Sequence, residues 1–221
     1  MTTAPVQTEQ HDVIRRPASY EEYQVEASES HIAEWVDGEM IEYMPPLLHH
    51  QEITWFLFSL IKGFVEALDL GLVGAGPFEF KLWPGGPARE PDVFFISKTR
   101  LAHLTERRFE GSPDIAVEVI SHGSVREDRV RKFSEYEQAG VGEYWLIDSR
   151  PYQQTAEFYR RDSEGLLQPV EIQAGIFLST ALPHFRFHVE WLWRTPMPSY
   201  RDVLQAIFDG DDTLPPGLRA V

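Results

Sequence analysis

Two acidic residues stand at positions where a charged side chain is costly to bury. Glu118 lies in the segment DIAVEVI, which is apolar on both faces of the expected strand, so its carboxylate shares a face with Ala116 and Ile120. Asp92 opens a second apolar strand, DVFFI. A buried carboxylate must be paired, protonated or bound to a metal ion. If the two strands are neighbours, both acids converge on one site, and such paired oxygens suit Mg²⁺. The competing interpretation is a structural ion pair or a turn cap.

A lysine is the next candidate for this site. Residues 126–138 read as a helix whose apolar stripe contains Val130 and Phe133. Lys132 lies on the flank of that stripe, from where it can reach over a sheet edge toward the strand acids. The alternative is an ordinary pair with Asp128 one turn earlier, which contributes only a few tenths of a kcal/mol.

Other polar residues are weaker candidates. His50 continues the apolar stripe of a long helix, where a histidine is more often a hydrogen-bonded core residue than a ligand or proton carrier. Glu34 and Glu39 flank a turn, where acids usually face solvent. Arg129 and Arg131 belong to a basic group that either contacts phosphates or forms a solvated face.

The elements that must position these residues follow from periodicity and turn residues. Asp37-Gly38 between two strand-like runs predicts a hairpin, and Ser19 caps a short helix. Glycines at 71, 74 and 76 are expected only to stop the long helix. In chain order the pattern predicts helices at 19–27, 48–68 and 126–138 and after Pro196, and strands at 78–83, 92–96, 114–120, 143–147, 156–160 and 170–172. Alternating periods of this kind predict a mixed α/β class around one sheet.

Length and composition limit the classes of protein. A chain of 221 residues predicts one domain, which we place at 19–195, after a disordered lead at 1–18 and before a C-terminal helix and tail at 196–221. The absence of cysteine excludes disulfides and zinc–thiolate sites. No apolar run reaches the roughly 20 residues of a membrane helix, and the N-terminus lacks a secretory pattern. We therefore expect a cytoplasmic protein without a membrane partner.

The net charge of −15 argues against tight binding to nucleic acid. Its distribution weakens the argument, because residues 1–52 hold 11 acids and 2 bases, whereas residues 53–150 hold 15 acids and 12 bases. Most of the excess negative charge therefore lies in the N-terminal 52 residues, and the net charge does not decide whether nucleic acid is a partner.

Five segments in order resemble one family. EWVDGEM, HHQEI, EPDVFFIS, PDIAVEVIS and DRVRKFSEYEQAGVGEYWLID, between residues 20 and 159, are similar to the Uma-type restriction endonucleases of the PD-(D/E)XK nuclease superfamily. The resemblance implies a restriction-endonuclease-like core of helix, three strands, helix and strand, with a central mixed sheet flanked by helices. The N-terminal β-hairpin would be an extension of that core. The same order of elements follows from the periodicity.

The resemblance also implies roles for individual residues. Asp92 matches the acid of the Pro-Asp motif, and Glu118 matches the (D/E) of (D/E)XK. Residue 120 is Ile where the superfamily pattern has Lys. The resemblance implies that this family carries the lysine on the following helix, where Lys132 stands at the matching place. Asp92 and Glu118, with the main-chain carbonyl of Val119, would hold Mg²⁺ or Mn²⁺.

Lys132 would then orient a water or stabilise negative charge, and His50 or Glu39 would act as a proton carrier or outer ligand. The implied activity is metal-dependent hydrolysis of DNA phosphodiester bonds, with Arg129 and Arg131 as candidate DNA contacts. Two alternatives remain open: a catalytically silent nuclease-fold module, and a hydrolase of small phosphoesters. A homodimer is plausible, since oligomers are mostly two-fold symmetric.

Overall fold

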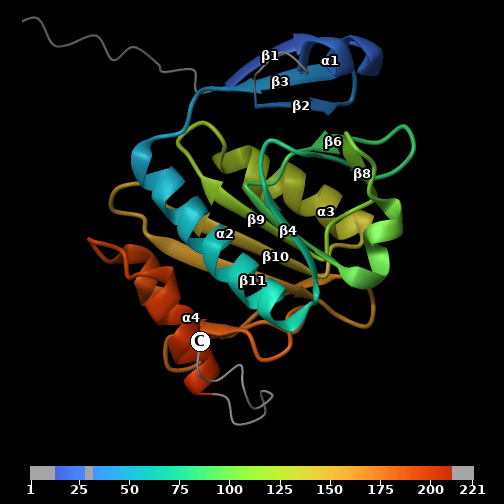
Figure 1. Ribbon diagram of the computed structural model, residues 1–221. Helices are drawn as coiled ribbons and strands as arrows, with labels where there is room; N and C mark the ends of the chain where they lie inside the picture. The colour runs from blue at the N-terminus through green and yellow to red at the C-terminus, as the bar shows by residue number, and fades with distance from the viewer. Residues whose placement is uncertain (1–12, 28–31, 211–221) are drawn as a thin grey trace, which may run out of the picture.

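The computed structural model describes residues 13–27 and 32–210 (Figure 1). Within these ranges the helices are α1 (Tyr20–Glu26), α2 (Leu48–Leu68), α3 (Phe133–Ala139) and α4 (Tyr200–Asp209), with short helical turns η2 (Lys98–His103), η3 (Glu127–Lys132) and η4 (Val189–Trp193). No helix in this part of the chain has the length and apolar character needed to cross a membrane.

The central sheet carries the core of the molecule. Its strands, in spatial order, are β12 (Leu167–Pro169), β11 (Thr155–Arg161), β10 (Glu143–Asp148), β9 (Ile115–Ile120), β7 (Val93–Ser97) and β4 (Gly71–Ala75). Strands β9 and β10 are parallel, and the other neighbours are antiparallel. The sheet is therefore mixed, which confirms the predicted class.

Helices cover both faces of this sheet (Figure 1). Helix α2 packs on one face with α4, η4 and the ribbon of β13 (Ile176–Leu178) and β14 (Arg186–His188), around Val117 and Trp145. Helix α3 lies on the opposite face, where alternate strand residues such as Ala116 and Tyr144 are buried. Because side chains alternate along each strand, both faces of the sheet can be apolar.

A second sheet contains the predicted hairpin. Its strands, in order, are β1 (Val13–Pro17), β3 (Glu39–Tyr43), β2 (Ala33–Val36), β6 (Ala88–Arg89), β5 (Glu79–Lys81) and β8 (Arg108–Glu110). Asp37 and Gly38 have φ of 50° and 82°. Both central residues of a type I′ hairpin turn require such values, so the expected hairpin is confirmed.

The first of the three predicted core strands, at 78–83, is not part of the central sheet. Residues 78–83 contribute β5 to the second sheet, and β4, at 71–75, pairs with β7 in the central sheet. The glycines of this segment were expected only to end the helix. A Cβ on Gly74 would lie 2.1 Å from the ring of Phe94, so the strand needs glycine to pass beneath that ring.

Two further expectations are wrong at the edges of the chain. Residues 13–17, placed in the disordered lead, form β1, because Val13 to Pro17 pair with β3. Residues 1–12 of that lead lie outside the described residues. The strand expected at 170–172 lies earlier, at 167–169, as the partner of β11.

The C-terminal helix belongs to the core. Val203, Ile207 and Phe208 of α4 are buried against the same cluster as α2, so this apolar segment covers the sheet. The boundary placed at residue 196 therefore does not separate this helix from the core.

Candidate active site

Glu118 lies on β9, and Asp92 immediately precedes the neighbouring strand β7, so the two strands are neighbours as expected. Val93 of β7 pairs with Val117 of β9 in antiparallel register. Asp92, which precedes Val93, therefore lies opposite Glu118, which follows Val117. The main-chain N–H of Val119 donates to Asp92 Oδ2 over 2.7 Å. His50, at the start of α2, approaches the same oxygen with Nε2 at 3.4 Å. Three elements therefore converge on this end of the sheet.

Glu118 is recessed in the sheet. Its side chain is only 4% exposed, and its two oxygens have separate partners. Tyr136 of α3 donates its hydroxyl to Oε1 over 3.1 Å, and Lys132 Nζ lies 3.0 Å from Oε2. Burial raises the pKa of Glu118 well above its usual range, and the neighbouring carboxylates add to this although Lys132 lowers it. An added cation would therefore stabilise its charged form.

Lys132 is surrounded by carboxylates. Its Nζ lies 3.0 Å from Glu34 and from Glu118, and 3.3 Å from Asp128. Burial lowers the pKa of Lys132, but these acids outweigh burial and raise it well above its usual range. The ammonium is therefore held charged beside the strand acids.

The turn that carries Lys132 is a π-helix. In η3 the charged residues Glu127, Asp128 and Lys132 are buried, whereas Val130 is 59% exposed. The prediction that Val130 belongs to a buried apolar stripe is therefore wrong. A π-helical turn has more residues than an α-helical one, which changes the direction in which each side chain points, and such turns are frequent at functional sites.

Sequence reasoning missed the importance of Glu34 and did not single out Arg89. Glu34 is fully buried on β2, where it accepts the Tyr43 hydroxyl at 2.6 Å and pairs with Arg89 at 2.8 Å. Burial raises the pKa of Glu34, but Lys132 and Arg89 outweigh burial and lower it to about 2. Its position in the sequence could have indicated that Glu34 is buried, because it lies inside the short strand β2, before Trp35, and not in the turn at residues 37 and 38.

Arg89 joins the hairpin to the helical side of the site. It is fully buried and pairs with Glu34, with Glu127 at 2.9 Å and with Glu135 at 2.5 Å. Arg15 of β1 also pairs with Glu127. The second sheet is thus tied by buried charges to the helix that carries Lys132.

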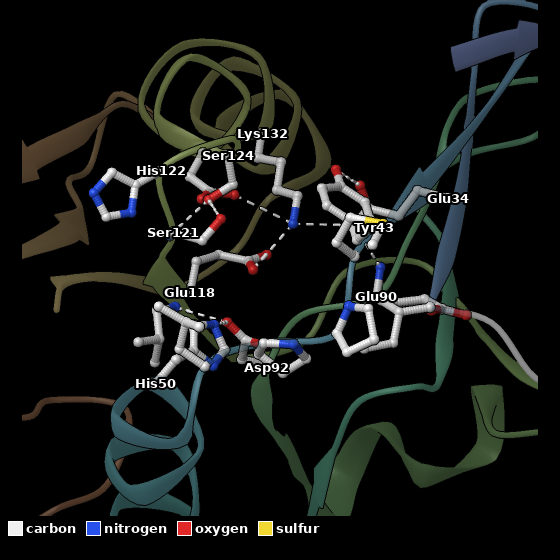
Figure 2. Close-up of a pocket in the computed structure, with 17 residues that line it drawn as sticks. Glu34, Tyr43, His50, Glu90, Asp92, Glu118, Ser121, His122, Ser124 and Lys132 are labelled. Carbon is white, nitrogen blue, oxygen red and sulfur yellow. Dashed lines mark hydrogen bonds and ion pairs between the residues drawn. The ribbon is translucent and has the colours of Figure 1, made fainter. Parts of the chain in front are cut away.

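Asp92, Glu118 and Lys132 line one pocket of about 590 Å³, together with Glu34 and His50 (Figure 2). Figure 2 shows Lys132 reaching from its helix toward Glu118, with Asp92 and His50 on one side and Glu34 on the other. Burial raises the pKa of Asp128, which also lines the pocket, to about 6. The lining residues are Ile32, Glu34, Tyr43, Met44, Pro45, Pro46, Leu47, His50, Glu90, Asp92, Glu118, Val119, Ser121, His122, Ser124, Asp128 and Lys132.

Comparison with known proteins identifies the family. Residues 17–190 match the model of the family described as Uma2, "Putative restriction endonuclease", which is more than half of the chain. The chain belongs to the Uma2 family. The match includes every pocket residue named above, and it confirms the resemblance drawn from the five sequence segments.

The fold agrees with this Uma2 assignment. The chain is similar to a crystal structure from Anabaena variabilis ATCC 29413 that is described as a "putative nuclease belonging to DUF820". The TM-score is 0.60 at 19% identity, over 73% of this chain and 89% of that chain. At this identity the likeness concerns the fold alone. No match was found among curated proteins.

Three of the predicted residues do not line the pocket of the Uma2 chain. Glu39, expected as a proton carrier or outer ligand, lies beside the hairpin turn with its side chain 47% exposed and 3.7 Å from Arg15. Arg129 pairs with Glu157 at 2.6 Å and with Asp148 at 3.4 Å. Arg131 lies 3.9 Å from Glu127. The pocket receives Glu34 in place of Glu39, because β2, which faces β6, is the inner strand of the hairpin.

The carboxylates of Asp92 and Glu118, which do line the pocket, fit a hard divalent cation. In the described residues no group of three or more histidine or acidic side chains has the arrangement of a complete ligand set. Mg²⁺ does not need one, because it usually keeps several waters and binds one or two carboxylates. Asp92 Oδ2 is engaged by the main-chain N–H of Val119 and by His50. Two carboxylates with water in the remaining positions suit Mg²⁺ or Mn²⁺.

Proposed function

We propose that this Uma2 protein is a metal-dependent endonuclease that hydrolyses phosphodiester bonds of DNA. The convergence of Asp92, Glu118 and Lys132 in one pocket, from two strands and a helix, carries the proposal. Acidic side chains outnumber basic ones in the pocket, so a bound cation would balance negative charge that Lys132 alone does not neutralise. A module that had lost the activity would have no reason to keep so costly a set of buried charges.

Asp92 and Glu118 would hold the Mg²⁺ or Mn²⁺ ion, with the main-chain carbonyl of Val119 as a further ligand. The bound ion would supply Lewis acidity toward the phosphate and lower the pKa of a coordinated water. Lys132, kept charged by its acidic neighbours, would stabilise negative charge that develops on the phosphoryl oxygens. Pre-placed charges of this kind need no reorganisation during the reaction.

His50 would carry a proton. Burial lowers its pKa, but Asp92 and a main-chain hydrogen bond with Val119 outweigh burial, so the pKa is raised above its usual value. An imidazole in this range can both take and give a proton near neutral pH. Glu34 would act through Lys132, as a positioning residue.

Cleavage of supercoiled plasmid and single-stranded DNA tests the proposal. The full chain would be incubated with Mg²⁺, with Mn²⁺ and with EDTA, beside Glu118→Gln and the control Glu66→Gln. We expect cleavage in either metal and none in EDTA, and a loss of about 100-fold or more in Glu118→Gln. Glu118→Gln should fold, because burial already favours the neutral carboxyl. Glu66, exposed on α2, should tolerate its change.

Calorimetric titration with Mn²⁺ separates the alternatives. No cleavage and no bound Mn²⁺ would overturn the proposal in favour of a silent module. Bound Mn²⁺ with hydrolysis of bis(p-nitrophenyl) phosphate but not of DNA would overturn it in favour of a small-phosphoester hydrolase. Cleavage that persists in Glu118→Gln would show that the site is elsewhere.

A further inference from the structure

The pocket has two chemically different parts. The residues expected to act on the phosphate are recessed, with the side chains of Glu118 and Lys132 each 4% exposed. The residues between the hairpin and α2 are apolar and face solvent: Met44 is 54% exposed and Leu47 is 70% exposed. We call Ile32, Met44, Pro45, Pro46 and Leu47 the apolar rim; all five line the same pocket.

The recessed position of Glu118 and Lys132 restricts which form of nucleic acid can react. A phosphate must enter the pocket to approach Asp92 and Glu118, and a duplex carries its phosphates on a stiff double helix. A single strand is flexible enough to place one nucleotide inside the pocket. The volume of about 590 Å³ lies in the range of pockets that enclose small ligands.

Charge cannot supply much of the binding energy at this pocket. Among the described residues, Lys132 is the one lysine or arginine that lines it, and three carboxylates already surround that lysine. Arg15 and Arg16 of the nearby β1 also pair with glutamates. Binding through phosphates needs cations that can replace the counterions of the strand. Apolar contact with an uncharged base remains available at the aliphatic side chains of the rim.

We propose that the apolar rim is a binding site for a nucleobase of single-stranded DNA, whose adjoining phosphate enters the acidic part of the pocket. This inference rests on the proposed nuclease function. Two consecutive prolines restrict the backbone of the rim, so it presents a preformed surface at low entropic cost. The exposed apolar side chains beside a strongly acidic pocket are then explained by contact with the uncharged part of the substrate.

Binding measurements without cleavage test this site. Anisotropy of a fluorescein-labelled 12-nucleotide strand would be measured in EDTA, beside its matched duplex and an abasic strand that keeps the phosphates. We expect the ordinary strand to bind at least about 10-fold more tightly than either, because only it offers a free base.

The double variant Met44→Ser/Leu47→Ser should weaken binding of the ordinary strand about 5–10-fold. Serine at position 47 is a favoured N-cap for α2, so the variant should fold. Leu178→Ser, another exposed leucine, on β13 outside the pocket, is the matched control and should bind as the unmodified chain does.

The outcomes distinguish this inference from the nuclease proposal. Equal binding of strand, duplex and abasic strand, with the rim variant unchanged, would overturn the base site, and metal-dependent cleavage would then still support the nuclease. The absence of all cleavage would overturn the nuclease, whereas rim-dependent binding in EDTA would still support the base site.

Discussion

Glu34 connects the hairpin to Lys132. It pairs with Arg89 and with Lys132, and it also accepts the main-chain N–H of Glu90 at 3.1 Å. Removal of one member of a buried charge network leaves the others without a partner, which is more costly than the net contribution of the intact pair. The position of Lys132 therefore depends on a strand that is distant in sequence.

The low pKa of Glu34 predicts a pH-dependent stability. A carboxyl whose pKa falls from 4.5 to about 2 on folding stabilises the folded state above pH 4.5, and that stabilisation is lost as the pH falls toward 2. Glu34→Gln should therefore lower the free energy of unfolding at pH 7 by on the order of 3 kcal/mol. The difference from the unmodified chain should shrink below pH 4.5.

Urea unfolding of both proteins between about pH 3 and pH 7 measures this difference. Glu66→Gln, an exposed change on α2, should cost less than about 1 kcal/mol at every pH. A difference for Glu34→Gln that stays constant over the whole pH range would contradict the assigned pKa.

At the scale of elements, β4 illustrates how glycine completes the sheet. Gly74 lies opposite Phe94 of β7, and the Phe94 ring occupies the space where a Cβ would stand. The ring also packs on Phe80 at a centroid distance of 4.7 Å, which links the central sheet to β5. Glycine at this position therefore serves packing between the two sheets, although glycine is otherwise unfavourable in a strand.

Gly74→Ala should destabilise the protein by about 1–3 kcal/mol, because the new methyl group overlaps a packed ring. Phe94→Leu should relieve part of that overlap. In a double-mutant cycle followed by urea unfolding, the combined variant should lose less free energy than the sum of the two single losses, with a coupling of about 0.5–3 kcal/mol. Strict additivity would show that the ring and the glycine do not interact.

At the scale of the whole molecule, the charge of −15 is consistent with a narrow mode of contact with nucleic acid. Arg15 near the site pairs with an acid, and so do Arg129 and Arg131, which were expected to meet DNA and lie outside the pocket. Long-range attraction of a polyanion is therefore weak, and the proposed recognition of DNA would depend on what enters the pocket.

This organisation predicts a shallow salt dependence. For a strand bound through one or two phosphates, log K should fall against log salt concentration with a slope of about −0.7 to −1.4. Anisotropy titrations of the single strand in EDTA, over roughly 50–300 mM NaCl, measure the slope. A slope steeper than about −3 would reveal a cationic surface that engages several phosphates.

The sequence by itself was sufficient for features that depend on near neighbours. The bounds of α2, the capping box of Ser19 and the turn at Asp37-Gly38 follow from local periodicity and turn chemistry. Asp92 and Glu118 were recognisable as candidates because a charge inside an apolar strand is costly wherever that strand lies.

Only the tertiary structure decided which distant groups meet. The choice of Glu34 over Glu39, the three acids around Lys132 and the strand at Gly74 all depend on which strands pair and which way a π-helical turn points its side chains. These outcomes are set by contacts between residues far apart in the chain, and local propensity contains no information about them.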